Sequence, residues 1–170
     1  MQISAVIITR NEERNLERAL ASLAAVADEV IVVDSGSTDR TREIAERAGA
    51  RFVAHAWEGY APQKNFAANQ AHHDWILSID ADERLSIELA DEIVKWKSTT
   101  LPALGAAYSM PRRTFYLGKW IRHSGWYPDR KIRLYDRRVC RWEGDFVHEY
   151  VHNFHKTLTF VYTITIFPFG

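Results

Sequence analysis

The stretch EVIVVDSGSTDRT, residues 29–41, decides the fold. Its first six residues are an apolar, β-branched run that predicts a buried strand, and SGSTD after them predicts a turn. A helical pattern follows through Ile44, Ala45 and Ala48 to Gly49, a residue typical of the position just after a helix. A buried strand, a turn and a helix with one apolar face form the repeating unit of α/β proteins.

The same alternation continues on both sides of this stretch. Residues 4–9 predict a strand, and Asn11 predicts the N-cap of a helix whose first turn carries Glu12 and Glu13. One buried face of that helix is predicted by the spacing of Leu16, Ala19, Leu20 and Leu23. Further along, the pattern predicts strands at 51–54 and 75–79 and helices that start near Pro62 and Ser86.

After residue 100 the helical pattern stops. Short β-like pieces at 106–110, 131–135 and 158–167 alternate with loops rich in Trp, Tyr and Arg. We expect an α/β fold with a mainly parallel, mixed sheet flanked by helices, in which 1–170 is one domain and the second half completes the sheet.

Composition excludes several classes of protein. The 170 residues carry 22 basic and 22 acidic side chains and are 46% apolar, which argues against a disordered chain and against a nucleic-acid binder. Cys140 is the single cysteine, so an internal disulfide and a cysteine-based zinc site are excluded. We see no secretory signal and expect a cytoplasmic location. The charge is uneven, because residues 110–142 carry 10 basic and 2 acidic side chains.

Three polar clusters follow predicted strands: TRNEE at 9–13, DSGSTD at 34–39 and DADE at 80–83. Each alone is as consistent with a turn or a helix cap as with a ligand contact. Ligands of open α/β sheets bind beyond the carboxyl ends of the strands, where these three clusters would meet. The sequence therefore predicts a binding site built from all three.

The pair Asp80 and Asp82 is the sharpest feature of these clusters. Alternate residues of a strand face opposite sides, so both carboxylates reach one ion only if the strand breaks into a turn there. Hard oxygen ligands suit Mg²⁺ or Mn²⁺, which typically take one or two carboxylates together with phosphate oxygens of a substrate. A divalent ion of this kind is the expected cofactor.

Five ordered segments carry a family resemblance: IITRNEERNLERAL, EVIVVDSGSTDRT, QKNFAANQA, WILSIDADERLS and SGWYPDRKIRLYDRRVCRWEGDFVHE. Together, across about residues 3–150, they resemble inverting family 2 glycosyltransferases with the GT-A fold. The last segment most resembles the branch that contains lipopolysaccharide-core β-1,4-glucosyltransferases. The resemblance implies transfer of a hexose, with glucose expected, from a UDP-sugar to a glycan or glycolipid acceptor of the cell envelope.

The resemblance also implies roles for residues 1–100, as the nucleotide-sugar-binding half. Thr9 and Glu12 would sit at the nucleotide base, and Asp34 would contact the uracil. Lys64 and Asn65 would lie along the nucleotide-sugar. The metal ion would be held by Asp82, with Asp80 contacting both the ribose and the metal.

Residues 101–170 would be the acceptor and catalytic half, and would supply the general base that an inverting transfer needs. The candidates are Asp129, Asp136, Asp145, His148 and Glu149. The ending GDFVHE favours Glu149, with Asp145 second, and His148 is a candidate metal or diphosphate contact. Asp136 stands beside arginines and is expected to pair with one of them.

The basic segment has two candidate roles. Arg130 and Arg133 would meet the diphosphate of the donor, or a phosphate of the acceptor, because a guanidinium binds phosphate oxygens in pairs. Arg112, Arg113, Lys119 and Arg122, which alternate with aromatic residues, would rest against an anionic membrane surface. The alternative for all of them is solvation or pairing with the acidic first half.

Two departures from the family pattern bear on activity. The chain stops at Gly170, earlier than members of this branch, and Ile166 stands near a position where they often have a histidine. The acceptor half is therefore expected to be incomplete, and residues 158–167 to form an exposed apolar edge. The alternatives are a non-catalytic nucleotide-sugar-binding protein and a nucleotidyltransferase, against which the absence of a Gly-rich basic loop after the first strand argues.

Overall fold

The computed structural model describes residues 1–99, 107–116, 119–120, 129–144, 149–153 and 157–166. Four helices are formed in these residues: α1 (Leu16–Leu23), α2 (Thr41–Arg47), α3 (Tyr60–Asn69) and α4 (Ile87–Lys97). The strands of the first half are β1 (Ile3–Thr9), β2 (Glu29–Asp34), β3 (Arg51–Ala54), β4 (Trp75–Asp80) and β5 (Glu83–Leu85). The strands of the second half are β6 (Ala107–Tyr116), β7 (Lys119–Trp120), β8 (Asp129–Asp136), β9 (Cys140–Glu143), β10 (Tyr150–Asn153), β11 (Thr157–Thr159) and β12 (Ile164–Ile166).

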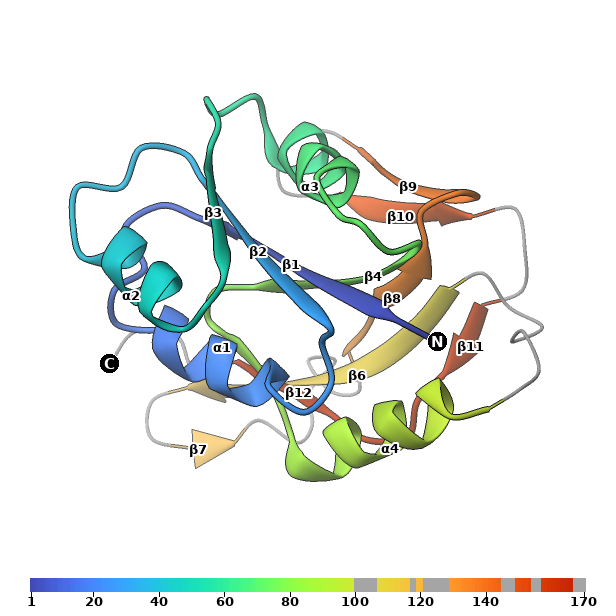
Figure 1. Cartoon of the computed structure of the whole chain (residues 1–170). Coiled ribbons are helices and arrows are strands. Elements are labelled where there is room, and N and C mark those ends of the chain that lie inside the picture. Colours follow the sequence, from blue (N-terminus) through green and yellow to red (C-terminus); the bar gives the residue numbers. More distant parts are fainter. Residues whose placement is uncertain (100–106, 117–118, 121–128, 145–148, 154–156, 167–170) are drawn as a thin grey trace.

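One large sheet contains strands from both halves of the chain. Its order is β3-β2-β1-β4-β8-β6-β12-β5, with β7 and β11 attached to β6 (Figure 1). The neighbours among β1 to β4 are parallel, whereas β8 runs antiparallel to both β4 and β6. The sheet is therefore mixed, as predicted, with its parallel half at the N-terminal end of the chain.

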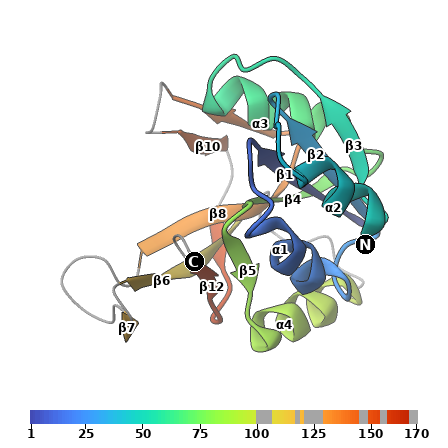
Figure 2. The same cartoon turned by 90° about the vertical axis from the view of Figure 1, so that its left-hand side faces the viewer.

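Helices cover both faces of the parallel strands. On one face, α1, α2 and α4 pack against the sheet in one apolar cluster. Its members include the predicted buried face of α1, formed by Leu16, Ala19, Leu20 and Leu23. On the opposite face α3 packs with the antiparallel pair of β9 and β10, in a second cluster around Tyr135 and Trp142. Figure 2 shows the two layers on either side of the sheet.

The prediction of an exposed apolar edge at 158–167 is wrong for β12 only. Among the described strands β11, which includes Leu158, pairs with β6 alone, and Val161 is 73% exposed. β12 lies inside the sheet, parallel to β6 on one side and antiparallel to β5 on the other. Ile164 is consequently 1% exposed. The reason is that β5, a short strand directly after the DAD turn, covers the edge that β12 would otherwise present.

Candidate active site

A cavity of about 580 Å³, the first pocket, lies where β1, β2 and β4 end. The register aligns Thr9 with Asp34 and Ile8 with Asp80, which brings the three polar clusters of the sequence together. The convergence predicted from the strand ends is confirmed. The lining residues are Ile8, Thr9, Arg10, Glu12, Ser35, Trp57, Tyr60, Asp80, Ala81 and Asp82.

Asp34 lies beneath this pocket. It is 3% exposed, and its carboxylate accepts hydrogen bonds from the Thr9 hydroxyl (2.9 Å) and from the backbone N–H groups of Gly36 (2.9 Å) and Ser37 (2.8 Å). Gly36 has a φ of 94°, a conformation that glycine adopts without strain. Asp34 therefore fixes the loop after β2 and orients Thr9, while its contact with uracil stays a prediction.

Asn11 does not cap a helix, so that prediction is wrong. Its φ of 55° is left-handed, and the helix begins only at Leu16. The Asn11 side-chain oxygen instead accepts a hydrogen bond from the N–H of Thr38 (2.8 Å), and its own N–H donates to the hydroxyl of Ser37 (2.7 Å). These bonds join the loops after β1 and β2, which is why the residue stands outside the helix.

Two buried cations hold the carboxylate of Asp80. The Lys64 ammonium lies 3.0 Å from Oδ1, and the Arg133 guanidinium lies 3.0 Å from Oδ2. Burial raises the pKa of Asp80, but the charges of Arg133 and Lys64 outweigh that effect and lower it to about 2. Asp80 is thus a fixed anion, and it lines two cavities at once.

Glu83 was not among the predicted site residues, although it follows the DAD turn directly. It is fully buried, and its two carboxylate oxygens accept hydrogen bonds from Arg133 Nε and Nη2, both at 2.8 Å. It also accepts the backbone N–H of Asp80 (3.0 Å). Glu83 therefore ties Arg133 to the end of β4. The signal that could have revealed it is its place in the DADE cluster, one residue after Asp82.

Asp82 differs from Asp80 in having no cationic partner among the described side chains. Burial and the negative charges of Glu83, Asp80 and Glu12 raise its pKa to about 6. The chain breaks into a turn between β4 and β5, so Asp80 and Asp82 both line the first pocket as the metal prediction required. An uncompensated carboxylate in an acidic pocket fits a divalent cation.

A protein cage for a metal ion is not formed by the described residues, since no group of three or more His, Cys, Asp or Glu side chains is placed to hold one. Mg²⁺ often binds through one or two carboxylates and completes its shell with water and phosphate oxygens. The donor set of Asp82 and Asp80 fits that mode, in which substrate oxygens supply the remaining ligands.

A second cavity of about 320 Å³, the second pocket, adjoins the first through Asp80. Its walls come from β6, β8, β9 and β10, and it contains Glu149 beside the pocket's basic residues. Glu149 pairs with Lys64 at 2.9 Å, and Lys64 lies 4.3 Å from the centre of the Trp142 ring. The lining residues are Asp80, Arg112, Arg130, Lys131, Ile132, Arg133, Trp142, Glu149, Tyr150 and Val151.

The remaining predicted residues are placed as follows. The Asn65 amide exchanges hydrogen bonds with the backbone of Trp142 (2.8 and 2.9 Å), so it joins α3 to β9. Arg130 and Arg133 line the second pocket and not the first. Asp136 pairs with Arg138 at 2.6 Å, as expected. Asp145 and His148 lie outside the described residues.

Two aromatic residues of the first pocket were missed. Trp57 and Tyr60 are 45% and 39% exposed, and their rings meet edge to face with centres 4.8 Å apart. Exposed rings at the mouth of a polar cavity provide flat apolar surfaces against which a base or a sugar can pack. Their place between β3 and α3, at the carboxyl end of a strand, is the signal that could have identified them.

Comparison with known proteins identifies the family. The family model described as glycosyl transferase family 2 matches residues 4–155. An uncharacterised glycosyltransferase of Rickettsia typhi is 37% identical over 163 residues, which cover 94% of this chain and 56% of the relative. The lipopolysaccharide core biosynthesis glycosyltransferase LpsC of Rhizobium meliloti is 41% identical over 119 residues, which cover 61% of this chain and 44% of LpsC.

A solved structure has the same fold. It is glucosyl-3-phosphoglycerate synthase of Mycobacterium tuberculosis, in complex with Mn²⁺, UDP and glucosyl-3-phosphoglycerate. It is 26% identical and superposes with a TM-score of 0.50 over 69% of this chain and 44% of that one. The chain spans between about a third and just over half of the length of the curated relatives it matches. By its sequence match and its GT-A fold, the chain belongs to glycosyltransferase family 2.

Proposed function

We propose that the chain transfers a hexose, expected to be glucose, from a UDP-sugar to the lipopolysaccharide core or another envelope glycan. One observation carries the proposal: the acidic first pocket at the strand ends and the second pocket with its carboxylate meet at a single residue, Asp80. Donor and acceptor sites of a transferase must meet in this way, because the two reacting atoms have to come into contact.

The first pocket is proposed to bind the donor. Thr9 and Glu12 line this pocket, and we expect them to contact the base; the Mycobacterium structure that shares the fold contains UDP and Mn²⁺. Asp82 and Asp80 would hold Mg²⁺ or Mn²⁺, and the ion would supply positive charge to neutralise the departing diphosphate. Lys64, Asn65, Arg130 and Arg133 stay predictions as donor contacts.

Glu149 is proposed as the general base. The hydroxyl oxygen of the acceptor attacks the anomeric carbon of the donor sugar, and the bond from that carbon to the diphosphate oxygen breaks. UDP leaves with the bonding electron pair, and the hydroxyl proton passes to a Glu149 carboxylate oxygen. Attack opposite the leaving group inverts the anomeric configuration. Lys64 holds Glu149 and Asp80 together, which sets the base beside the junction of the two pockets.

The LPS acceptor and the location of the protein are the finer parts of the proposal. LpsC, by its name, acts in lipopolysaccharide core biosynthesis, and this supports an envelope acceptor. In the described residues no helix has the length and apolar character needed to span a membrane. A cytoplasmic protein that touches an anionic membrane surface through the basic segment, including Arg112 and Arg113, stays a prediction.

The test is UDP release from UDP-glucose, with water as acceptor, in three variants. Asp82→Asn is expected to lose the stimulation by Mn²⁺, and Glu149→Gln to release UDP about 100-fold more slowly while still binding UDP. Glu46→Gln, on the exposed surface of α2, is the matched control and keeps the wild-type rate. Mn²⁺-dependent release that survives in Asp82→Asn contradicts the metal site, and full activity in Glu149→Gln moves the base to Asp145.

UDP binding without turnover in the wild-type chain would select the alternative, a non-catalytic nucleotide-sugar-binding protein. The nucleotidyltransferase alternative is not supported, since the matched family is one of glycosyltransferases.

A further inference from the structure

We propose that the second pocket binds an acceptor sugar that carries a carboxylate or a phosphate group. This proposal rests on the proposed function, because it names the acceptor class of the same site. The donor is proposed to bind in the first pocket, so in this proposal Arg130 serves the acceptor and not the donor diphosphate. The charges, the aromatic side chain and the size of the second pocket support it.

The pocket has an excess of positive charge. Arg112 and Lys131 share the carboxylate of Asp129, at 2.5 and 3.4 Å, and Arg112 also lies 3.9 Å from Glu83, which pairs with Arg133. Within the described part of the chain, the side chain of Arg130 forms no hydrogen bond or ion pair and is exposed, while its backbone pairs with β6. The guanidinium of Arg130 is therefore available to an anion, and its five N–H donors match the oxygens of a carboxylate or a phosphate.

The deeper cations of the pocket are already paired and do not compete for that anion. Arg133 is held by Glu83 and Asp80, and Lys64 is held by Asp80 and Glu149. The buried cations Arg133 and Lys64 are thus neutralised by carboxylates, whereas the exposed cation, Arg130, is available to a ligand. A charged substituent would be held near the solvent, and the rest of the sugar would point toward Glu149.

The same pocket contains an aromatic side chain that suits a sugar ring. Tyr150 is 54% exposed on β10, and an exposed aromatic ring packs well against the apolar face of a pyranose. Glu149 is next to it in the chain, and its side chain is 17% exposed, so its carboxylate reaches the cavity. The second pocket thus combines three groups that such a sugar needs. Arg130 can bind its charged group, Tyr150 can pack against its ring, and Glu149 can accept the proton of its hydroxyl.

The second pocket is the smaller of the two cavities, at about 320 Å³ against about 580 Å³. The first pocket is nearly twice as large and shares Asp80 with it. A charged acceptor sugar in the second pocket therefore lies beside the donor and not in its place.

The experiment follows backbone amide resonances of the chain saturated with UDP and Mg²⁺. The probes are glucose 6-phosphate against glucose, and galacturonate against galactose, so the two arms separate phosphate from carboxylate recognition. Resonances of Ile132 and Val151 report on the second pocket, and those of Thr9 and Ser35 on the first. The charged probes are expected to shift the Ile132 and Val151 resonances at concentrations about tenfold lower than the neutral sugars do.

Arg130→Gln is expected to weaken binding of the charged probe about three- to tenfold, and more than it weakens binding of UDP. Arg42→Gln is the matched control, because Arg42 is exposed on α2, far from β8–β10, and pairs with Glu46 in its own helix (Figure 1). Charged and neutral sugars that bind equally well overturn the proposal. Displacement of the charged probe by UDP also overturns it. So does an Arg130→Gln variant in which the affinities for the charged probe and for UDP fall equally.

The result separates this proposal from the proposed function. Absence of UDP binding contradicts the proposed function. UDP binding without any shift of Ile132 or Val151 by either charged probe contradicts only the charged acceptor.

Discussion

At the scale of single residues, Asp80 is the centre of the site because cations from two distant parts of the chain hold it. Lys64 comes from α3 and Arg133 from β8, and Glu83 anchors Arg133 in turn. A carboxylate held in this way cannot rotate, and Asp82, two residues along, faces the first pocket without a cation of its own. The two neighbouring aspartates therefore differ in their surroundings: Asp80 is held by two cations, whereas Asp82 has no cationic partner among the described side chains and is the less compensated of the two proposed metal ligands.

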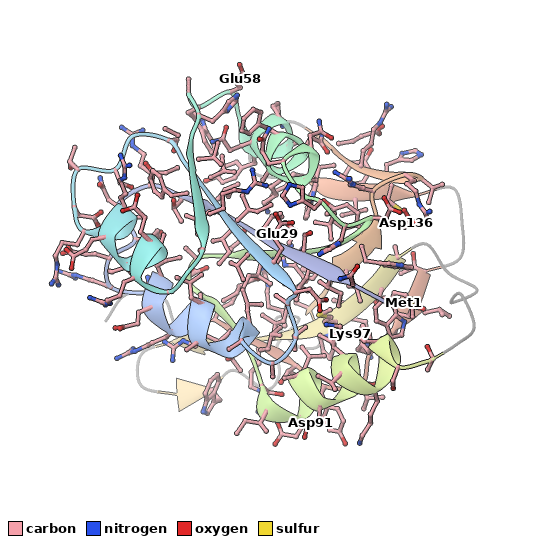
Figure 3. The ribbon with its side chains drawn as sticks, viewed as in Figure 1. Met1, Glu29, Glu58, Asp91, Lys97 and Asp136 are labelled. Carbon is pink, nitrogen blue, oxygen red and sulfur yellow. The ribbon has the colours of Figure 1, made fainter. Side chains whose placement is uncertain are left out.

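Glu83→Gln tests this network. The substitution removes the negative charge that balances Arg133 in a fully buried site, so we expect a loss of about 3–5 kcal/mol in the free energy of unfolding, measured in urea. Glu58→Gln, which changes an exposed side chain at the outer edge of the molecule (Figure 3), is the control and should cost under about 0.5 kcal/mol. Equal stabilities of the two variants would show that Glu83 does not balance Arg133.

At the scale of elements, the sequence predicted most of what periodicity and capping encode locally. The strand at residues 29–34, the cap of α4 by the Ser86 hydroxyl (3.2 Å from the Leu89 nitrogen) and the buried face of α1 are confirmed. The start of α1 was missed, because Asn11 bonds to the next loop and not to its own helix. The spacing of neighbouring residues cannot predict a hydrogen-bond partner that lies about 27 residues away in the sequence.

A hydrogen-bonded clamp centred on Asp28 joins β1, α4 and the loop before β2, and gives the stability of the fold a pH dependence. The Asp28 carboxylate accepts hydrogen bonds from the N–H of Ile3 in β1 and from Lys97 in α4, both at 2.7 Å. The N-terminal ammonium of Met1 donates to the Lys97 carbonyl at 2.7 Å, and Figure 3 shows the two residues side by side. Burial raises the pKa of Asp28, but the bonds from Lys97 and Ile3 outweigh it and lower the pKa.

Asp28→Asn is therefore expected to destabilise the protein by about 1–2 kcal/mol at pH 7. A lowered carboxyl pKa stabilises the fold above the ordinary pKa of the group, and this contribution is lost as the pH falls through the folded-state value. The difference between wild type and variant should shrink below about pH 4. Asp91→Asn, on the exposed face of α4, is the control for urea unfolding across this range. A difference that does not change with pH would contradict the clamp.

At the scale of the whole molecule, the sheet joins the acidic first half to the basic second half. β8 lies beside β4, so Arg133 reaches Asp80 and Glu83 across 53 and 50 residues of sequence. The charge asymmetry predicted an anionic partner for the basic segment, and part of that partner is the first half itself. The site of Arg133 and the position of β12 depend on long-range strand pairing, which local periodicity does not encode.

The placement of β12 inside the sheet can be tested by truncating its buried side chain. Ile164→Ala should lower the free energy of unfolding by about 2–5 kcal/mol, because Ile164 is 1% exposed in the core that α1 and α4 share. Val161→Ala, at a position 73% exposed, should change it by less than about 0.5 kcal/mol. If both substitutions are harmless, β12 does not belong to the folded sheet.

The central claim is that the first pocket binds a uridine nucleotide together with a divalent cation at Asp82. Isothermal calorimetry of the wild-type chain with UDP-, GDP- and TDP-sugars, with and without Mn²⁺, measures it directly. The account predicts binding of the UDP-sugars, at least about tenfold tighter with Mn²⁺ than without, and loss of that difference in Asp82→Asn. Absence of binding to every nucleotide-sugar, or UDP-sugar binding that Mn²⁺ does not strengthen, would contradict it.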